Sequence, residues 1–275
     1  MLLADNWLQQ MNLKLITKHL SSIIKINPKI CILLGSGLNY FAENIRKKIT
    51  IPYSDIPTFY QTSVKGHIGE FIYGEINNTP ILCAKGRFHY YEGYTFNEVG
   101  SIIEIFNSYN PKLCIITNSS GCLDKKWPIG SFMLSNQIID FSFMNSTEPT
   151  KHNFKKSQYF DLAKEIAKNN NINLFTGAYT YTTGPSYETP AEISEIISLG
   201  GKAVGMSTFP EYLKCIELKL SFVIISCLTN YGAGLINEKI KHKDVLTNAN
   251  KMRKIFSKYI IEIIQNIELQ KKLKK

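Results

Sequence analysis

The chain has 275 residues, of which 44% are hydrophobic and 20% are charged, and its formal net charge is +10. This composition is that of an ordinary globular protein, which excludes a disordered chain, a collagen and a coiled coil. Apolar runs stay well short of the ~20 residues that a membrane-spanning helix needs, and the N-terminus lacks the basic start of a secretion signal. We therefore expect a cytoplasmic protein without a membrane partner.

Short apolar runs bounded by Gly, Pro or Asn alternate along the chain with segments of helical periodicity. In chain order, the expected strands are Ile30–Leu34, Glu70–Ile76, Ile81–Ala84, Leu113–Thr117, Phe132–Ser135, Gly177–Thr182, Ala203–Gly205 and Ser221–Leu228. The expected helices are Leu13–Lys25, Asn97–Ser108, Ser157–Asn169, Pro190–Leu199, Phe209–Leu218 and a long terminal helix from about Lys243 to Leu269. This alternation predicts an α/β fold with a parallel or mixed sheet. Because no linker rich in Pro, Gly or Ser divides the chain, we expect a single domain over residues 1–275.

Three of the expected helices begin with the capping-box sequence Thr-x-x-Glu, at the pairs Thr95/Glu98, Thr189/Glu192 and Thr208/Glu211. A helix start leaves backbone N–H groups exposed, and ligands of open α/β sheets bind at the end of the sheet where such starts follow strands. The polar stretch Asn145–Lys156 follows neither the helical nor the strand period, and it predicts a mobile surface loop.

The positive charge comes mainly from lysine, because Arg46, Arg87 and Arg253 are the only arginines. The lysines are spread along the chain, apart from a small cluster at the C-terminus. A basic protein can bind nucleic acid, but this spread is more typical of a solvated surface. We expect no nucleic-acid partner, although the positive field would still steer an anionic substrate.

The six cysteines form no Cys-x-x-Cys pair, and four of them lie within apolar stretches. Free buried cysteine behaves as a small hydrophobic residue. The spacing therefore favours buried thiols over a zinc site or a disulfide framework, and we expect no bound metal.

The run Gly35-Ser36-Gly37 directly follows an expected strand and begins like a dinucleotide-binding Gly-x-Gly-x-x-Gly loop. Tyr40 stands where the third glycine would be, which disfavours a dinucleotide site. A tight turn and a phosphate cradle, in which Ser36 and backbone N–H groups hold an anion, both remain open. The sequence contains no P-loop, nucleophile-elbow or zinc-protease signature.

The run from Gly86 to Tyr94 places Arg87, His89 and Tyr91 in one loop after an expected strand. A guanidinium offers a planar fork of donors that suits phosphate, which an ammonium cannot copy. Taken alone, this run is equally compatible with a structural polar network and with an anion site. His67 stands within Gly-His-Ile-Gly and, taken alone, is more typical of a turn.

Further polar side chains follow expected strands or precede expected helix starts. They are Ser119 in TNSSGC, Tyr187 and Glu188 in GPSYETP, Met206 and Ser207 in VGMST, Asn230 after the strand FVIISCL, and His242 before the last helix. Each of these runs, taken alone, is compatible with an ordinary loop or a helix cap.

Taken together, these motifs resemble those of the trimeric-type purine nucleoside phosphorylases. The runs GSGL, GHIGE, GRFHYYEGY, TNSSG, GPSYETPAE, VGMSTFPE and the final Thr-Asn occur in that family's order, from about Ile30 to His242. The resemblance implies one α/β domain around a mixed, partly barrel-like sheet flanked by helices, and a homotrimer. It also implies phosphorolysis of inosine, guanosine and their deoxy forms in purine salvage. Inorganic phosphate would be a co-substrate, and no cofactor would be needed.

The resemblance also implies a role for each matching residue. Phosphate would be held by Ser36, His67, Arg87, His89, the backbone N–H of Ser119, and Ser207. Tyr187 would stack on the purine, Glu188 would bond its N1 edge and Asn230 would bond N7. Tyr91, Met206 and His242 would contact the ribose. Asn230, His89 and Glu188 would be the catalytic residues. Phe154 would reach the site of a neighbouring subunit.

Two alternative functions are weighed against the positions where the sequence departs from the family pattern and against the positive net charge of the chain. The sequence reads TNSSGC where family members often read TNAAGG, and it has Tyr231-Gly232 where they often have Met-Ala. The related methylthioadenosine phosphorylases place an aspartate at the position of Asn230 and lack a histidine for the 5′ position, so Asn230 and His242 favour 6-oxopurines. A non-enzymatic nucleotide- or nucleic-acid-binding module is the alternative from a different class.

Overall fold

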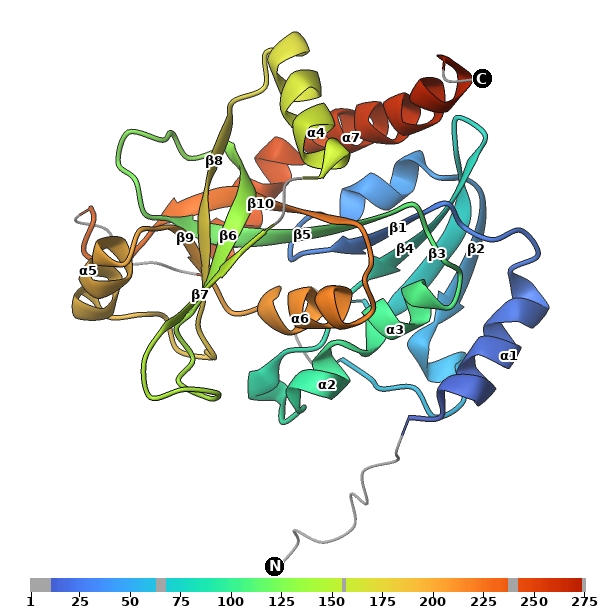
Figure 1. Cartoon of the computed structure of the whole chain (residues 1–275), viewed down its shortest axis with the longest axis horizontal. Coiled ribbons are helices and arrows are strands. Elements are labelled where there is room, and N and C mark those ends of the chain that lie inside the picture. Colours follow the sequence, from blue (N-terminus) through green and yellow to red (C-terminus); the bar gives the residue numbers. More distant parts are fainter. Residues whose placement is uncertain (1–10, 63–67, 155–156, 237–241, 274–275) are drawn as a thin grey trace, which may run out of the picture.

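In this computed structural model, the residues described are 11–62, 68–154, 157–236 and 242–273. They form a large sheet with helices on both sides (Figure 1). The helices are α1 (Leu13–Ile23), α2 (Phe96–Val99), α3 (Ser101–Asn107), α4 (Gln158–Asn169), α5 (Pro190–Ser198), α6 (Phe209–Glu217) and α7 (His242–Leu273). The strands are β1 (Ile30–Leu34), β2 (Arg46–Pro52), β3 (Glu70–Ile76), β4 (Thr79–Lys85), β5 (Leu113–Cys122), β6 (Phe132–Asp140), β7 (Thr150–Asn153), β8 (Leu174–Tyr181), β9 (Gly201–Gly205) and β10 (Phe222–Tyr231).

The sheet is mixed and partly closed. Its strand order is β10-β6-β8-β9-β5-β1-β4-β3-β2, and an additional pairing of β10 with β5 joins five strands into a ring. Within this ring, β5–β10, β6–β8 and β8–β9 are parallel, whereas β10–β6 and β5–β9 are antiparallel. The expected mixed, partly barrel-like sheet is therefore confirmed.

Strand β1 shows why the core has two layers. All five of its residues are buried, because side chains alternate between two covered faces. Cys31 and Leu33 pack into the cluster that includes α1, α3 and α6, whereas Ile30 and Ile32 pack into the cluster that includes α4 and α7. Figure 1 shows α4 and α7 on one side of the sheet and α1, α3 and α6 on the other.

All eight strands expected from the sequence are present, and most of them extend further than expected. Strand β5 continues from Thr117 to Cys122, and β6 continues from Ser135 to Asp140. The expected helix Asn97–Ser108 is divided at Gly100 into α2 and α3. The extensions run into polar residues, which is why an apolar pattern could not predict them.

Strands β2 and β7 were not expected from the sequence. Within the described ranges both lie at an edge, where β2 pairs only with β3 and β7 only with β6, and most residues of β2 are exposed. An edge strand exposed to water needs no apolar alternation, so the pattern gave no signal. The prediction of an irregular loop over Asn145–Lys156 is therefore wrong for Thr150–Asn153.

All six cysteines are buried and free. Among the described residues, no helix has the length and apolarity to cross a membrane. Within the same part of the chain, no three His, Cys, Asp or Glu side chains group together as they would around a metal ion.

Candidate active site

A cavity opens at the carboxyl ends of the parallel strands β1, β4, β5 and β10. With its mouth and the open solvent there included, it spans about 750 Å³ of empty space. Its walls come from the loops after β1 and β4, from the second half of β5, from β9 and β10, and from the loop before α5.

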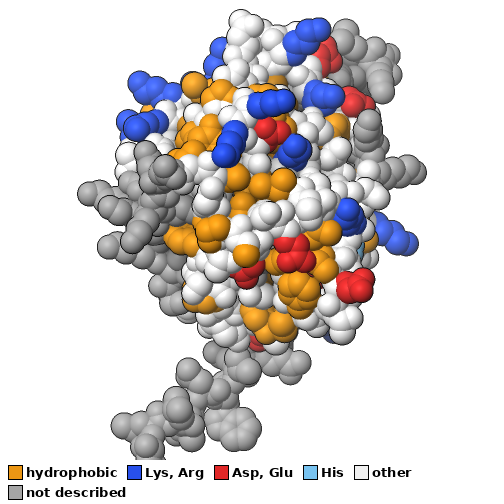
Figure 2. All heavy atoms as spheres, turned by 90° about the vertical axis from the view of Figure 1, so that its left-hand side faces the viewer, with side chains coloured by type: hydrophobic (Ala, Val, Ile, Leu, Met, Phe, Trp, Pro, Cys, Tyr) orange, Lys and Arg blue, Asp and Glu red, His pale blue; other side chains and the backbone are white. Residues whose placement is uncertain are grey.

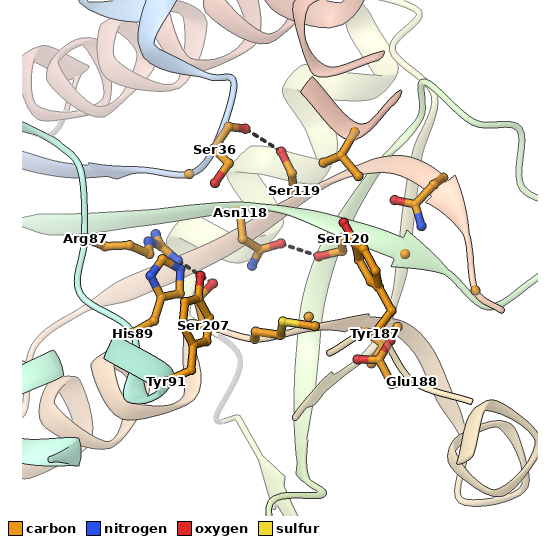
Figure 3. A pocket seen from close by; sticks show the side chains of 18 residues that line it. Ser36, Arg87, His89, Tyr91, Asn118, Ser119, Ser120, Tyr187, Glu188 and Ser207 are labelled. Atoms are coloured by element: carbon orange, nitrogen blue, oxygen red, sulfur yellow. Dashed lines mark hydrogen bonds between the residues drawn. The ribbon is translucent and has the colours of Figure 1, made fainter. Parts of the chain in front are cut away.

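Most of the site residues expected from the sequence meet at this cavity (Figure 3). Those that line it are Ser36, Arg87, His89, Tyr91, Ser119, Tyr187, Glu188, Met206, Ser207 and Asn230. His67 lies outside the described residues. His242 is the first residue of α7, but its side chain is not among those described.

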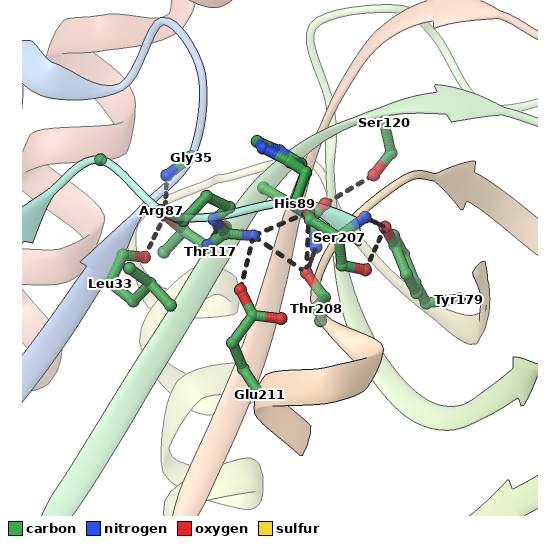
Figure 4. Close-up of polar contacts among 12 residues, drawn as sticks. Leu33, Gly35, Arg87, His89, Thr117, Ser120, Tyr179, Ser207, Thr208 and Glu211 are labelled. Carbon is green, nitrogen blue, oxygen red and sulfur yellow. Dashed lines mark hydrogen bonds and ion pairs between the residues drawn. The ribbon is translucent and has the colours of Figure 1, made fainter. Parts of the chain in front are cut away.

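Arg87 is the buried cation of the site, with 1% of its surface exposed. Its Nη1 donates to Ser207 Oγ over 2.7 Å and to Thr208 Oγ1 over 3.3 Å. Its Nη2 donates to the carbonyl oxygen of Thr117 over 2.6 Å, and Glu211 Oε1 lies 3.7 Å from Nη1 (Figure 4). These contacts hold the planar guanidinium in one orientation at the wall of the cavity.

The loop after β1 is fixed directly against β5. Gly35 N–H donates to Thr117 Oγ1 over 3.1 Å, and Ser119 Oγ donates to the carbonyl oxygen of Ser36 over 2.6 Å (Figure 3). A Cβ atom on Gly35 would lie 2.6 Å from the Cα of Asn118, so only glycine permits this close approach. These contacts fix the loop at the wall of the cavity, and its role as an anion cradle stays a prediction.

His89 is oriented by a carboxylate and by a ring. Its Nδ1 lies 3.0 Å from Glu92 Oε1, and its backbone N–H donates to the same oxygen over 2.8 Å. The imidazole stacks on Tyr91 with ring centroids 4.7 Å apart and an interplanar angle of 18°. Burial raises the pKa of Tyr91 to about 12, so the phenol keeps its proton at neutral pH and can donate a hydrogen bond.

At the other end of the cavity, Glu188 accepts a hydrogen bond from Thr182 Oγ1 over 2.7 Å. Burial raises the pKa of Glu188 above its ordinary value, and the Thr182 hydroxyl acts in the opposite direction. Asn230 Oδ1 accepts from Thr229 Oγ1 over 3.0 Å, and Asn230 Nδ2 donates to the Tyr231 carbonyl oxygen. These contacts fix which side of the Asn230 amide accepts and which side donates.

The capping boxes predicted at Thr95 and Thr189 are confirmed, with both reciprocal bonds present. The third prediction, at Thr208 and Glu211, is wrong. Thr208 has a φ of +81° and makes no capping bond, because its hydroxyl accepts from Arg87 and Asn118 instead. Glu211 is fully buried beside the Arg87 guanidinium rather than at the helix cap. The charge of Arg87 thus overrides the local capping pattern.

The sequence assigned no binding or catalytic role to three residues that support this site. They are Asn118, whose Nδ2 donates to Thr208 Oγ1 over 2.9 Å, Thr182 behind Glu188, and Thr208 itself. Asn118 and Thr208 lie within the runs TNSSGC and VGMST, so the sequence already indicated that they are near the site. Thr182 carried no signal, since its contact depends on how the loop before α5 folds back.

Phe154 does not line the cavity. It packs on Tyr212 and Phe222 of its own chain, with ring centroids 5.0 Å and 5.4 Å apart, respectively. Its expected contact with a neighbouring subunit stays a prediction.

The comparisons with known proteins agree on one family. The family model described as the phosphorylase superfamily matches residues 29–265. Purine nucleoside phosphorylase 1 of Geobacillus stearothermophilus is 33% identical over 252 residues, covering 88% of this chain and 92% of that protein. Its namesake in Bacillus subtilis is 33% identical over 253 residues, covering 88% and 93%.

A solved structure agrees with the sequence matches. The crystal structure of a schistosoma purine nucleoside phosphorylase in complex with hypoxanthine has a TM-score of 0.83 and 29% identity, covering 92% of this chain and 96% of that one. The chain therefore belongs to the phosphorylase superfamily and, within it, to the family of the purine nucleoside phosphorylases.

Proposed function

We propose that this chain is a pentosyltransferase of purine salvage that cleaves purine nucleosides with phosphate. The products are the free purine base and ribose 1-phosphate, or deoxyribose 1-phosphate. The observation that carries the proposal is that one cavity joins an anion end, with Arg87 and Ser207, to an end that suits a purine, with Tyr187, Glu188 and Asn230. The names of the similar proteins and the hypoxanthine complex support the same reaction.

The anion end suits the charge that develops in this reaction. Cleavage of the bond between N9 and C1′ leaves positive charge on the sugar, which a phosphate beside C1′ stabilises and then captures. We assign the holding of phosphate to Ser36, Arg87, His89, the backbone N–H of Ser119, and Ser207, and we keep His67 in this set from the motif resemblance. Holding both reactants in line supplies the proximity contribution to the rate.

The purine end stabilises the negative charge that the base acquires. Tyr187 stacks on the ring, and ionised Glu188 accepts from the N1 edge. Asn230 Oδ1 has one lone pair beyond the one that Thr229 occupies, and it can accept from N7 once that nitrogen is protonated. Its Nδ2 can donate to a 6-oxo group. Such preorganised groups lower the barrier because they are strongest where charge develops.

We place the ribose between these two ends, against Tyr91 and Met206, with His242 at the 5′-hydroxyl. Both described residues line the cavity. The set of 6-oxopurine nucleosides, inosine and guanosine with their deoxy forms, is favoured over methylthioadenosine because Asn230 is an amide rather than a carboxylate. A cavity with polar groups at its walls also favours an enzyme over a nucleic-acid-binding module, which would use an open basic surface.

We further propose that the enzyme acts without a metal or other cofactor, in the cytoplasm, as a homotrimer. The face that carries α5 supports an assembly, because Figure 2 shows hydrophobic side chains exposed across it between scattered lysines and arginines. Phe143, Met144 and Ile197 are each more than a third exposed. Large exposed apolar groups often mark contacts between protein chains. Light scattering that showed a fully active monomer would refute the trimer and the proposed role of Phe154.

The test of the function is chromatography of inosine, guanosine, adenosine and methylthioadenosine after incubation with the enzyme. We expect cleavage of inosine and guanosine only when phosphate is present, with no inhibition by a chelator. Equal rates without phosphate would instead identify a hydrolase. Salt-sensitive binding of oligonucleotides without any cleavage would identify a binding module.

A further inference from the structure

Four polar side chains form a continuous hydrogen-bonded row in the wall of the cavity, in the order Ser120, Asn118, Thr208 and Ser207. The contacts are 2.5 Å from Ser120 Oγ to Asn118 Oδ1, 2.9 Å from Asn118 Nδ2 to Thr208 Oγ1, and 3.3 Å from Thr208 Oγ1 to Ser207 Oγ. None of the four is more than 8% exposed. Water therefore has little access to them, so each donor needs an acceptor within the row or in the site.

The row connects the two ends of the cavity. Ser120 lies at the purine end, because its carbonyl oxygen is 3.3 Å from Thr229 Oγ1, whose one hydrogen is shared between this oxygen and Asn230 Oδ1. Ser207 lies at the anion end, where Arg87 Nη1 donates to its Oγ over 2.7 Å. Figure 3 shows the bond between Asn118 and Ser120, and Figure 4 shows the contacts of Thr208 and Ser207 with Arg87.

Strand geometry explains how β5 provides this row. Side chains two residues apart on a strand share a face, so Asn118 and Ser120 lie side by side. The intervening Ser119 points to the opposite face, where its hydroxyl bonds the carbonyl oxygen of Ser36. The two neighbouring serines therefore serve different walls of the site.

Counting donors and acceptors shows which group of the row donates its hydrogen to which neighbour. This order of donation is the direction of the row. An amide has a donor side and an acceptor side, so a hydroxyl donated by Ser120 to Asn118 Oδ1 makes Nδ2 the donor to Thr208. Thr208 Oγ1 then accepts from Asn118 and from Arg87, which uses both its lone pairs. Its own hydrogen is left for Ser207 Oγ, which accepts from Arg87 as well. The hydrogen of the Ser207 hydroxyl is then directed to the cavity.

We propose that Ser120 and Asn118 are positioning residues that set this direction and so make Ser207 a hydrogen-bond donor to the bound anion. The opposite direction would turn a lone pair of Ser207 toward the anion, which an acceptor-only ligand opposes. The proposal rests on the proposed function only in taking phosphate as the natural ligand of this end.

Two anions of similar shape distinguish the two directions. Sulfate has only acceptor oxygens, whereas hydrogen phosphate also carries one O–H donor. A site in which Ser207 donates accepts both anions. A site in which Ser207 accepts can still pair with the O–H of hydrogen phosphate but has no favourable contact for sulfate. The ratio of the two affinities therefore reports the direction of the row.

The experiment is calorimetric titration of sulfate and of phosphate into wild type and Ser120→Ala, without nucleoside and at mildly alkaline pH. We expect the affinity for sulfate to fall about 3- to 10-fold, the effect of one hydrogen bond, and that for phosphate to fall distinctly less. Equal losses for both anions, or no loss for either, would overturn the proposal.

The matched control is Ser119→Ala, which removes a hydroxyl from the adjacent position of the same strand. It loosens the Ser36 loop without touching the row, so both anions are expected to weaken by the same factor. A change of ratio in this control as large as in Ser120→Ala would count against the row.

A second variant, Asn118→Asp, tests the same point if Ser120→Ala folds poorly. A carboxylate can only accept, so Thr208 must donate to it instead of to Ser207. Its charge repels both dianions, but the ratio is still expected to shift against sulfate, and an unchanged ratio would overturn the proposal. Because nucleoside is absent, a wild type without phosphorolysis would refute the proposed function and leave this result standing.

Discussion

The anion end and the purine end of the cavity are built in different ways. At the anion end, Arg87 is 1% exposed and Thr208 is fully buried, and each makes several hydrogen bonds within the protein. At the purine end, Tyr187 is 41% exposed and stands on the loop before α5. The protein thus holds the side chains of the anion end in place before any ligand arrives, whereas at the purine end the ring of Tyr187 is left exposed.

The difference suits the chemistry that the proposed function assigns to each end. A phosphate is small and strongly hydrated, so it is bound well only by donors that are already in place. A purine presents a wide apolar face and can itself complete the burial of an aromatic side chain. We therefore expect substitutions at the anion end to affect phosphate and those at the purine end to affect the nucleoside.

Arg87→Lys is expected to have the largest effect. The ammonium keeps the charge but cannot bond Ser207, Thr208 and the Thr117 carbonyl oxygen at once. Loss of even one or two charge-assisted bonds lowers kcat/KM by about 100-fold or more. The KM for phosphate should rise much more than the KM for inosine. If phosphate kinetics were unchanged, Arg87 would be purely structural and the two ends would not divide as described.

Asn230→Asp tests the purine end with a change of hydrogen-bonding character at constant shape. A carboxylate repels a 6-oxo group but accepts from the 6-amino group of adenine and from a protonated N7. One buried polar mismatch corresponds to about 10- to 100-fold in rate. The ratio of kcat/KM for adenosine over inosine is therefore expected to rise by that order, with the KM for phosphate little changed. A ratio that stayed level would show that Asn230 does not contact the purine.

Thr182→Val tests the ionisation of Glu188. The carboxyl must be ionised to accept from the N1 edge, so activity falls as the pH drops through its pKa. Burial already raises this pKa, Glu192 raises it further, and the Thr182 hydroxyl lowers it. Removing the hydroxyl takes away the contact that lowers the pKa of Glu188, so this pKa rises further. The acid limb of kcat/KM for inosine is expected to move to higher pH.

Thr182→Ser keeps the hydroxyl and is the control for this prediction. It should restore the position of the acid limb, whereas a loss of stability alone would lower activity at all pH values without moving the limb. An acid limb at the same pH in Thr182→Val and wild type would show that Thr182 does not act on Glu188.

The sequence alone predicted the α/β class and eight of the ten strands in the described part of the chain, since buried strands such as β1 carry continuous apolar runs that a covered sheet explains. It did not predict β2 and β7, because an exposed edge strand is held by backbone bonds that any side chain permits. Edge strands of this kind depend on a neighbour that is distant in the sequence.

The site was predicted as a set of motifs, but its geometry was not. Ser36, Arg87 and Ser207 were identified by their motifs, yet the capping role predicted for Thr208 is overridden by the buried guanidinium. Thr182 was missed because a threonine after a strand is common and its partner, Glu188, is reached only through a folded loop. Polar contacts across loops are decided by tertiary structure, which local patterns do not contain.

The smallest effect is expected from Thr189→Ala, which weakens the helix start that follows Glu188. The Thr189 hydroxyl accepts from Glu192 N–H and donates to its carboxylate, and loss of such a cap lowers stability by about 1 kcal/mol. Because the loop with Tyr187 and Glu188 ends at this cap, the KM for inosine should rise about 3-fold while the KM for phosphate stays constant. Thr95→Ala is the matched control, since it removes the same box from α2, which does not line the cavity. Both variants should lose similar stability in thermal unfolding, but only Thr189→Ala should change the KM for inosine. An equal change of that KM in both would mean that the purine end is as firmly fixed as the anion end, and the contrast between them would be lost.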